Sequence, residues 1–144
     1  MNHTATVGGW RAARIAGAAY QTLDRWIRTG LLTVEGPASG KGSRRRFTFL
    51  DLLRAKTVVY LRRQGITLQT IRKVQAALTE QWGQPDPLTQ AARLVVADDR
   101  LFWVWDDQTL LDALTGQLAA KPFLVLPVGR MVQEIGADLE KLAA

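Results

Sequence analysis

Hydrophobic residues recur every three to four positions through the first half of the chain, a spacing that predicts amphipathic helices. A short helix is expected over residues 10–16, with Trp10 among the side chains that pack inward. A second helix is expected over residues 19–32, with Trp26 on its buried face and Gly30 as its stop signal. The chain therefore begins with two consecutive helices joined by a short turn.

Two further helices are predicted before residue 82. One opens at a capping-box pattern, Thr48 to Asp51, with Asp in place of the usual Glu. It runs to residue 63. Its stripe is expected to comprise Leu52, Ala55, Val59 and Arg62, widened by Leu53 and Leu61. The next helix begins at Thr67, and its buried face is expected to comprise Leu68, Ile71, Val74 and Leu78.

Between the second and third helices the pattern predicts a β-hairpin. Residues 31–34 and 45–49 have the composition of short strands, and the Gly-, Pro- and Ser-rich segment between them is typical of a turn. Such a hairpin beside a pair of helices forms a wing. Residues 1–9 show no apolar period and are expected to form a loose tail.

The second half of the chain changes character. Strand-like runs separated by aspartates predict a hairpin over residues 93–97 and 101–105. Its Trp103 and Trp105 are expected on a sheet face buried against the last helix or a partner, with a ligand pocket as the alternative. A helix follows the hairpin, ends at Gly116 and has two possible cap residues, Asp106 and Asp107.

A proline-bounded strand over residues 121–127 and an amphipathic helix over residues 128–142 complete the chain. Proline cannot donate a ladder hydrogen bond, so this strand is expected at a sheet edge. Two prolines in residues 84–88 indicate a linker. The fold class is therefore α+β, with a mostly helical domain over residues 10–82 and a small ββαβα domain over residues 88–144.

Charge is distributed unevenly along the 144 residues, whose net charge is +6 and whose 47% hydrophobic content suffices for a packed core. Residues 1–81 hold 14 Lys and Arg against 4 Asp and Glu, whereas residues 82–144 hold 5 against 9. A basic protein can simply be soluble. An excess concentrated in the half with the helix pair and the wing favours a polyanionic partner instead.

Several classes of function are disfavoured. The absence of cysteine excludes disulfides, thiolate metal sites and thiol redox sensing. No apolar run approaches the roughly 18–20 residues of a membrane span, and no signal-peptide pattern is seen, so a cytoplasmic protein is expected. A cluster of aspartates is compatible with a divalent-metal or nuclease site, but turn and helix-cap duty explains its first four members at least as well. The members are Asp98, Asp99, Asp106, Asp107 and Asp112. With His3 as the single histidine, no catalysis, cofactor or metal is expected.

The outer face of the second helix offers side chains suited to duplex DNA. Gln21, Arg25 and Arg28 follow one another at i, i+4 and i+7, away from the buried face. Arginine can bind guanine and glutamine can bind adenine through paired hydrogen bonds, so Gln21 and Arg25 are candidates for reading bases. Tyr20, Thr22 and Arg28 are candidates for phosphate contacts, with an ordinary solvated helix face as the alternative.

The segment of the wing supplies a second set of cations. Candidates for contacts with the DNA backbone or the minor groove are Lys41, Arg44, Arg45 and Arg46. One of the three arginines is expected to brace the fold instead. Secondary phosphate contacts, with plain surface charge as the alternative, are expected at Arg11, Arg14, Arg54 and Lys56.

Five sequence motifs carry a resemblance to a known family. They are Arg14-Ile-Ala-Gly17, Thr22-Leu-Asp-Arg-Trp-Ile-Arg-x-Gly-Leu-Leu32, Arg45-Arg-Phe47, Asp51-Leu52, and Leu61-Arg-x-x-Gly-Ile-x-Leu-x-x-Ile-Arg72. Together they resemble the winged helix-turn-helix DNA-binding domain of the MerR family over residues 11–78. The resemblance implies that the second helix enters the major groove, that the wing and the neighbouring helix hold phosphates, and that dimers bind inverted repeats.

The chain also departs from the family's usual architecture. Thr22-Leu-Asp-Arg-Trp-Ile27 stands where a Thr-Leu-Arg-Tyr-Tyr-Glu segment is usual, and neither a long coiled-coil helix nor metal-sensing cysteines are found. The chain is similar to a divergent subgroup of small regulators and DNA-binding antitoxins with a compact C-terminal domain. Effector sensing is therefore not implied.

The sequence predicts a transcriptional regulator that binds an inverted-repeat operator in double-stranded DNA as a homodimer. The C-terminal half is expected to make the dimer, and the residues expected near the contact or the core beneath it are Val125, Val132, Ile135 and Leu139. One alternative is an antitoxin whose C-terminal half neutralises a toxin partner. Another is an architectural or recombination-directing factor that bends DNA.

Overall fold

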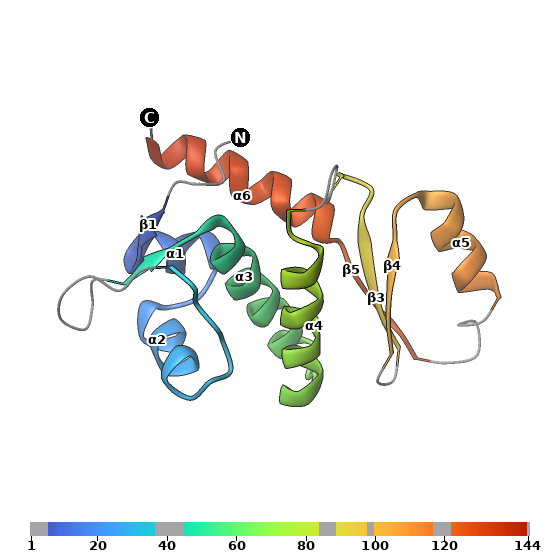
Figure 1. Cartoon of the computed structure of the whole chain (residues 1–144), viewed down its shortest axis with the longest axis horizontal. Helices are drawn as coiled ribbons and strands as arrows, with labels where there is room; N and C mark the ends of the chain where they lie inside the picture. The colour runs from blue at the N-terminus through green and yellow to red at the C-terminus, as the bar shows by residue number, and fades with distance from the viewer. Residues whose placement is uncertain (1–5, 37–44, 84–88, 98–99, 117–121, 144) are drawn as a thin grey trace. The chain divides into compact units, whose positions relative to one another are not determined.

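The computed structural model of the chain describes residues 6–36, 45–83, 89–97, 100–116 and 122–143. Helices and short strands follow one another along it (Figure 1). Lys41 and Arg44, two of the expected DNA contacts, lie outside the described residues. None of the described helices is both long enough and apolar enough to cross a membrane.

The first of two compact units comprises residues 1–82 together with residues 135–144. Its elements are β1 (Val7–Gly8), α1 (Gly9–Ala16), α2 (Tyr20–Arg28), β2 (Arg46–Phe47), α3 (Phe49–Arg63), α4 (Leu68–Gln81) and the last part of α6 (Val128–Ala143). The four helices predicted for this half are all present. Three have ends close to those expected from the sequence, whereas the second ends at Arg28, four residues earlier than expected.

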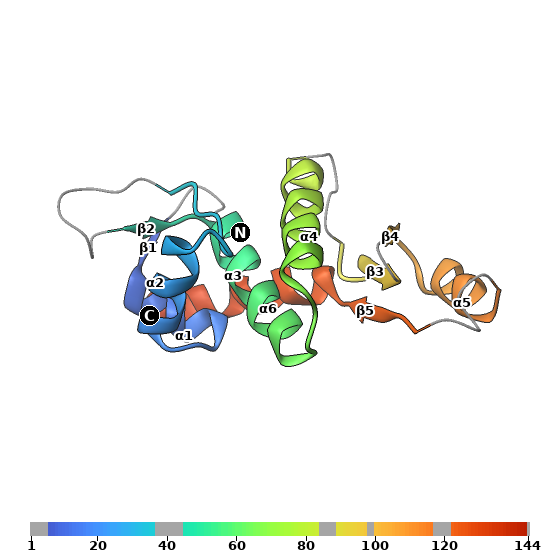
Figure 2. The same ribbon diagram turned by 90° about the horizontal axis from the view of Figure 1, so that it is seen from below.

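Helix α3 lies between α1 and α4 and forms the centre of this unit (Figures 1 and 2). Leu52, Leu53 and Leu61 on α3 are at most 1% exposed. The helix begins at the predicted capping box: the Thr48 hydroxyl accepts from the Asp51 N–H, and the Asp51 carboxylate accepts from the Thr48 N–H. Because burying one such leucine contributes about 1.5–3 kcal/mol, α3 supplies much of the stability of the unit.

The predicted wing hairpin is wrong in its strand pairing. Residues 31–34 form no strand, and β2 pairs instead with β1, so that Val7 lies opposite Phe47. In a strand with one face in solvent, neighbouring side chains point to opposite faces, so only one of two neighbours is buried. Leu31 and Leu32 are both buried, which does not fit such a strand. The segment expected to be a loose tail thus supplies the partner strand.

Three side chains expected in the core are exposed. Trp10 is 73% exposed and Leu68 is 46% exposed, while Arg62 lies on the outer side of α3. Each residue along a helix turns the side chain by about 100° around the helix axis. The buried side of α1 is formed by Ala12, Ala13, Ile15 and Ala16, and Trp10 points away from it. In α3, Leu53 and Leu61 lie in the core as expected, whereas Arg62 is exposed.

The second unit, residues 83–134, is built on a three-stranded antiparallel sheet in the order β4-β3-β5. Its elements are β3 (Arg93–Ala97), β4 (Arg100–Val104), α5 (Asp107–Thr115), β5 (Leu124–Leu126) and the first part of α6. β3 and β4 form the predicted hairpin, with Leu94 opposite Trp103. The proline-bounded strand β5 lies at an edge of the sheet, as predicted.

Helix α5 covers one face of this sheet. Its Leu110 packs against a small core around Val95, Ala97 and Val104. The rings of Trp103 and Trp105 stack on each other with centroids 5.3 Å apart. Trp103 is half-buried and Trp105 is 38% exposed, so the structure leaves part of both rings open to solvent.

Candidate nucleic-acid interface

A three-residue turn that begins at Gly17 joins α1 to α2. Gly17 has φ +84°, a left-handed conformation that glycine adopts without a steric penalty. Its N–H and that of Ala18 donate to the Ala13 carbonyl, at 2.9 and 3.1 Å. The guanidinium of Arg63, on α3, donates to the Gly17 carbonyl at 3.2 Å. These contacts fix the direction in which α2 leaves α1.

Helix α2 presents a polar and basic outer face. Gln21, Arg25 and Arg28 are all exposed, whereas Leu23 is fully buried. Trp26, which the sequence places in the core, is half-buried. The i, i+4, i+7 spacing read from the sequence therefore corresponds to an exposed stripe on a helix that packs through its other side.

A carboxylate on α2 holds two of the cations. Asp24 Oδ2 lies 2.9 Å from Nε of Arg28, and Asp24 Oδ1 lies 3.7 Å from an Nη atom of Arg45, the residue before β2. Exposed ion pairs contribute about 0–1 kcal/mol, so the main effect of Asp24 is to position these two guanidinium groups. In the described part of the chain, Arg25 has no ion-pair partner.

Tyr20, a candidate phosphate contact, packs through its ring. The ring stacks on that of Trp10 with centroids 5.1 Å apart and planes inclined by 22°. It also covers Gly9 so closely that a Cβ there would lie 2.2 Å from a ring carbon. Such an aromatic pair contributes about 0.5–1.5 kcal/mol beyond burial, so Tyr20 helps to join α1 to α2. Thr22, a second candidate, is half-buried.

Of the three consecutive arginines, Arg46 braces the fold. Its Nε donates to the Thr6 hydroxyl at 3.1 Å, and an Nη atom donates to the Thr6 carbonyl at 2.8 Å. These bonds accompany the β1–β2 pair, in which Gly8 lies opposite Arg46. Arg45 instead faces Asp24 with a side chain that is 27% exposed.

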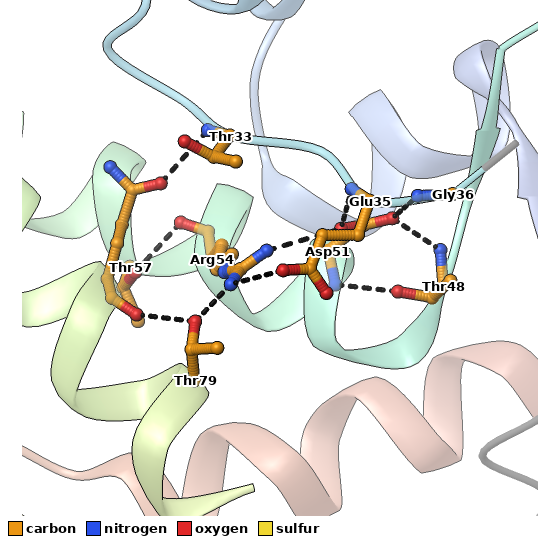
Figure 3. A network of polar contacts seen from close by, with 9 residues as sticks. Thr33, Glu35, Gly36, Thr48, Asp51, Arg54, Thr57 and Thr79 are labelled. Carbon is orange, nitrogen blue, oxygen red and sulfur yellow. Dashed lines mark hydrogen bonds and ion pairs between the residues drawn. The ribbon is translucent and has the colours of Figure 1, made fainter. Parts of the chain in front are cut away.

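A buried carboxylate holds the chain on both sides of residues 37–44. Asp51 is fully buried and accepts hydrogen bonds from the N–H groups of Glu35 and Gly36, each at 2.8 Å, and of Thr48 at 2.9 Å (Figure 3). Hydrogen bonds to an ionised acceptor are about twice as strong as neutral ones. The Asp51 side chain therefore holds residues 35–36 beside Thr48. In the predicted hairpin, backbone hydrogen bonds between two strands would have held these segments together.

Arg54, expected at the surface, is buried beside Asp51 and is 3% exposed. One of its Nη atoms bonds the hydroxyl of Thr79 on α4 and lies 3.2 Å from the Glu35 carboxylate (Figure 3). The other Nη atom lies 3.7 Å from Asp51. Both expectations for Arg54, a phosphate contact and a free surface charge, are wrong because this guanidinium neutralises the buried carboxylate next to it.

Gln75 on α4 holds the segment before Glu35. Its side-chain oxygen accepts from the Thr33 N–H at 3.1 Å, and its side-chain nitrogen donates to the Leu31 carbonyl. Sequence reasoning did not single out this residue. The available signal was a glutamine four residues after Ile71, on the buried face of the helix.

Arg14 lines a cavity of about 250 Å³ in the first unit. The other lining residues are Ile15, Asp138, Lys141 and Leu142. The last three come from the end of α6, which this unit includes. Arg14 therefore shares its surroundings with an acidic residue of its own chain.

The aspartates of the second half have structural roles where they are described. The Asp106 carboxylate caps α5 by accepting from the N–H and the hydroxyl of Thr109, at 2.7 and 2.8 Å. These bonds lower the pKa of Asp106 below its ordinary value. Asp98 and Asp99 lie outside the described residues. Within the described segments, no group of three His, Asp or Glu side chains could hold a metal ion.

Two helices joined by a tight turn, the second with an exposed basic stripe, define a helix-turn-helix domain. Residues 11–78 match the family described as MerR HTH family regulatory protein. This part of the chain is therefore a MerR-type helix-turn-helix domain, as the sequence motifs predicted.

Relatives of the chain are also described as helix-turn-helix proteins. Uncharacterised HTH-type transcriptional regulators of Mycobacterium tuberculosis and Mycobacterium bovis are 43% identical to it over 65 residues. The match covers 44% of this chain and 29% of each relative. The chain thus spans less than a third of the length of these curated relatives.

Proposed function

We propose that this chain is a transcriptional regulator that binds double-stranded DNA with sequence specificity. The observation that carries the proposal is the exposed stripe of Gln21, Arg25 and Arg28 on α2, the second helix of a MerR-type helix-turn-helix domain. In such domains the second helix lies in the major groove, where long hydrogen-bonding side chains reach base edges. No catalytic step is part of the proposal.

The surroundings of each side chain support a division of roles. Gln21 and Arg25 read bases, because both are exposed and Arg25 has no ion-pair partner in the described segments. Arg28 and Arg45 hold phosphates beside Gln21 and Arg25, since Asp24 positions both guanidinium groups.

The remaining candidates act around this centre. Lys41 and Arg44 extend the phosphate contacts along the basic segment, and Arg14 and Thr22 are outer contacts. Tyr20 and Arg46 act mainly as braces, because Trp10 and Thr6 already hold their side chains. The excess of 14 Lys and Arg over 4 Asp and Glu in residues 1–81 attracts the DNA backbone as a whole.

The proposal includes a homodimer on an inverted repeat. A two-fold axis between two copies would present two α2 helices to successive turns of the major groove, about 34 Å apart or a multiple of it. The C-terminal half of the chain is the proposed source of the dimer contact.

Selection from a pool of random duplexes with the full chain tests the proposal. The expected result is enrichment of an inverted repeat whose half-site centres are about 10 base pairs apart, or a multiple of that. The double variant Gln21→Ala, Arg25→Ala serves as the control and should enrich no such motif. Retention of all duplexes alike by the unaltered chain would contradict sequence-specific binding, whereas a single enriched half-site would contradict the dimer alone.

A further inference from the structure

The outer edge of β4 is apolar between its charged ends and lacks several of the features that protect sheet edges. β4 is an edge strand, because the sheet order is β4-β3-β5. The other edge strand, β5, is three residues long and is followed directly by Pro127, and both features discourage pairing. β4 is five residues long and contains neither proline nor lysine. Helix α5 packs through Leu110 on a face of the sheet, and in the described part of the chain no strand pairs with the outer edge of β4.

The charges at the two ends of this edge are opposite in sign, so the edge is complementary to a second, antiparallel copy of itself. The segment runs Arg100-Leu-Phe-Trp-Val-Trp-Asp106, with a cation at one end, an anion at the other and apolar residues between them. An antiparallel pair of two such segments, centred on Trp103, sets Arg100 of each copy opposite Asp106 of the other. Between them Leu101 lies opposite Trp105, and Phe102 lies opposite Val104.

Neighbouring registers do not match in this way. A pair centred on Phe102 would set Arg100 opposite Val104, and a pair centred on Val104 would set Asp106 opposite Phe102. Each of these registers leaves a charge against an apolar side chain. The sequence of the edge therefore favours one register.

The charged groups at the two ends of this edge are exposed, and its two tryptophans are partly exposed. Arg100 is exposed, and within the described segments it has no ion-pair partner. Asp106 is exposed, and its lowered pKa keeps it ionised at neutral pH. Trp103 and Trp105 stack on each other and are only partly covered, so a second copy would bury more of both rings.

We propose that β4 pairs with β4 of a second copy of this chain, in the antiparallel register centred on Trp103, and that the resulting six-stranded sheet is the dimer interface. The proposal deepens the proposed function, which requires a two-fold dimer for an inverted repeat. It concerns the protein alone, so it is tested without DNA.

Cysteine cross-linking tests the register, because the natural chain has no cysteine. Residues directly opposite each other in an antiparallel pair have Cα atoms about 4.5–5.5 Å apart, within the range of a disulfide. Full-length Trp103→Cys, oxidised under mild conditions, should therefore run mainly as a disulfide-linked dimer on a non-reducing gel. Val125→Cys, on β5, is the matched control and should remain uncross-linked.

A second pair of variants keeps Trp103 in place. Leu101→Cys alone should not cross-link, because in this register its own copy lies about 13 Å further along the partner strand. Trp105→Cys alone should not cross-link for the same reason. A mixture of the two, after dissociation and reassociation, should form a disulfide between unlike chains. Circular dichroism of each variant confirms that it is folded.

The outcomes separate this proposal from the proposed function. Cross-linking at residue 103 and in the mixture, with none in the single controls, supports the β4 pair. A dimer by light scattering that forms none of these disulfides overturns it, as does a monomeric full-length chain. Loss of operator selection with cross-linking intact would overturn the DNA-binding proposal alone.

Discussion

At the scale of single residues, Arg25 and Arg28 lie one turn apart on α2 but have different surroundings. Asp24 holds the guanidinium of Arg28 at 2.9 Å, whereas Arg25 has no ion-pair partner among the described residues. A guanidinium without an internal partner keeps both of its outer nitrogens for a base edge. Arg25, with Gln21 one turn before it, is therefore the side chain expected to discriminate between bases.

Replacing Arg25 by Ala should reduce the preference for the selected operator over a scrambled duplex by about 5- to 150-fold, because a bidentate base contact contributes about 1–3 kcal/mol of discrimination. Gln21→Ala should have an effect in the same range. Titration of both duplexes at fixed salt measures it. Arg72→Ala, which removes an exposed cation from α4, is the matched control and should leave the ratio unchanged. Equal losses on both duplexes would show that Arg25 only positions the protein.

The buried carboxylate of Asp51 holds three backbone N–H groups and the guanidinium of Arg54 in place. Asp51→Asn should lower the free energy of unfolding by about 2–4 kcal/mol, because N–H groups of Glu35, Gly36 and Thr48 lose a charged acceptor and Arg54 loses a buried anion. Urea unfolding measures the change. Thr48→Ala, which removes only the helix cap, should cost about 1 kcal/mol. Similar losses in the two variants would mean that Asp51 acts only as a cap residue.

At the scale of elements, Asp24 joins α2 to the residue before β2, because its carboxylate pairs with both Arg28 on the helix and Arg45. In the proposed function the helix and the basic segment of Lys41, Arg44 and Arg45 differ in their effect on binding. The helix is expected to make base contacts, which depend on sequence, and the segment is expected to supply cations, which release counterions from any duplex.

Replacement of Lys41, Arg44 and Arg45 by Ala should therefore weaken binding to all duplexes alike. The slope of log affinity against log salt should become shallower by about 0.9 for each phosphate that the variant no longer neutralises. Titrations between 50 and 200 mM salt measure the slope. The control removes three exposed arginines elsewhere, Arg62, Arg72 and Arg130, and so causes the same change in net charge. Equal slopes for the two triple variants would show that net charge alone, and no contact in this segment, sets the salt dependence.

At the scale of the whole molecule, the last turns of the chain belong with its beginning. Residues 135–144 form part of the first compact unit, although the sequence suggested a C-terminal domain that runs from residue 88 to residue 144. Ile135 is fully buried, and Leu142 lines a cavity with Arg14 and Ile15 of α1. The stability of the helix-turn-helix unit is therefore expected to depend on the end of α6.

Ile135→Ala should lower the free energy of unfolding by about 2–5 kcal/mol, the usual cost of a cavity in a core. Thermal and urea unfolding measure it. DNA affinity at low temperature, where the variant is still folded, should stay the same because Ile135 is no DNA contact. Glu140→Ala, an exposed residue of the same helix, should change stability by less than about 0.5 kcal/mol. Stability unaltered by Ile135→Ala would show that the first unit folds without the end of α6.

Part of the candidate site could be predicted from the sequence and part could not. The exposed stripe of α2 follows from helical periodicity alone, since residues four apart share a face. Periodicity could not assign Arg54 or Gln75, because each carries a polar side chain at a buried position. Apart from Asp51, which lies three residues before Arg54, their partners are 19 to 44 residues away. The sequence predicted that one of the three consecutive arginines braces the fold, but not that it is Arg46. Its acceptor, Thr6, lies in a segment without a periodic apolar pattern, so no local signal pointed to this contact.

The sequence by itself determined the helices, their caps and the helix-turn-helix domain. Capping boxes such as Thr48 to Asp51, stop glycines such as Gly65 and apolar periods act over a few residues, so they can be read locally. Only the tertiary structure decided the partner of β2, the burial of Arg54 and the inclusion of the end of α6 in the first unit. Each of these depends on groups distant in sequence that compete for the same hydrogen bonds or the same buried surface, and no local pattern records which of them prevails.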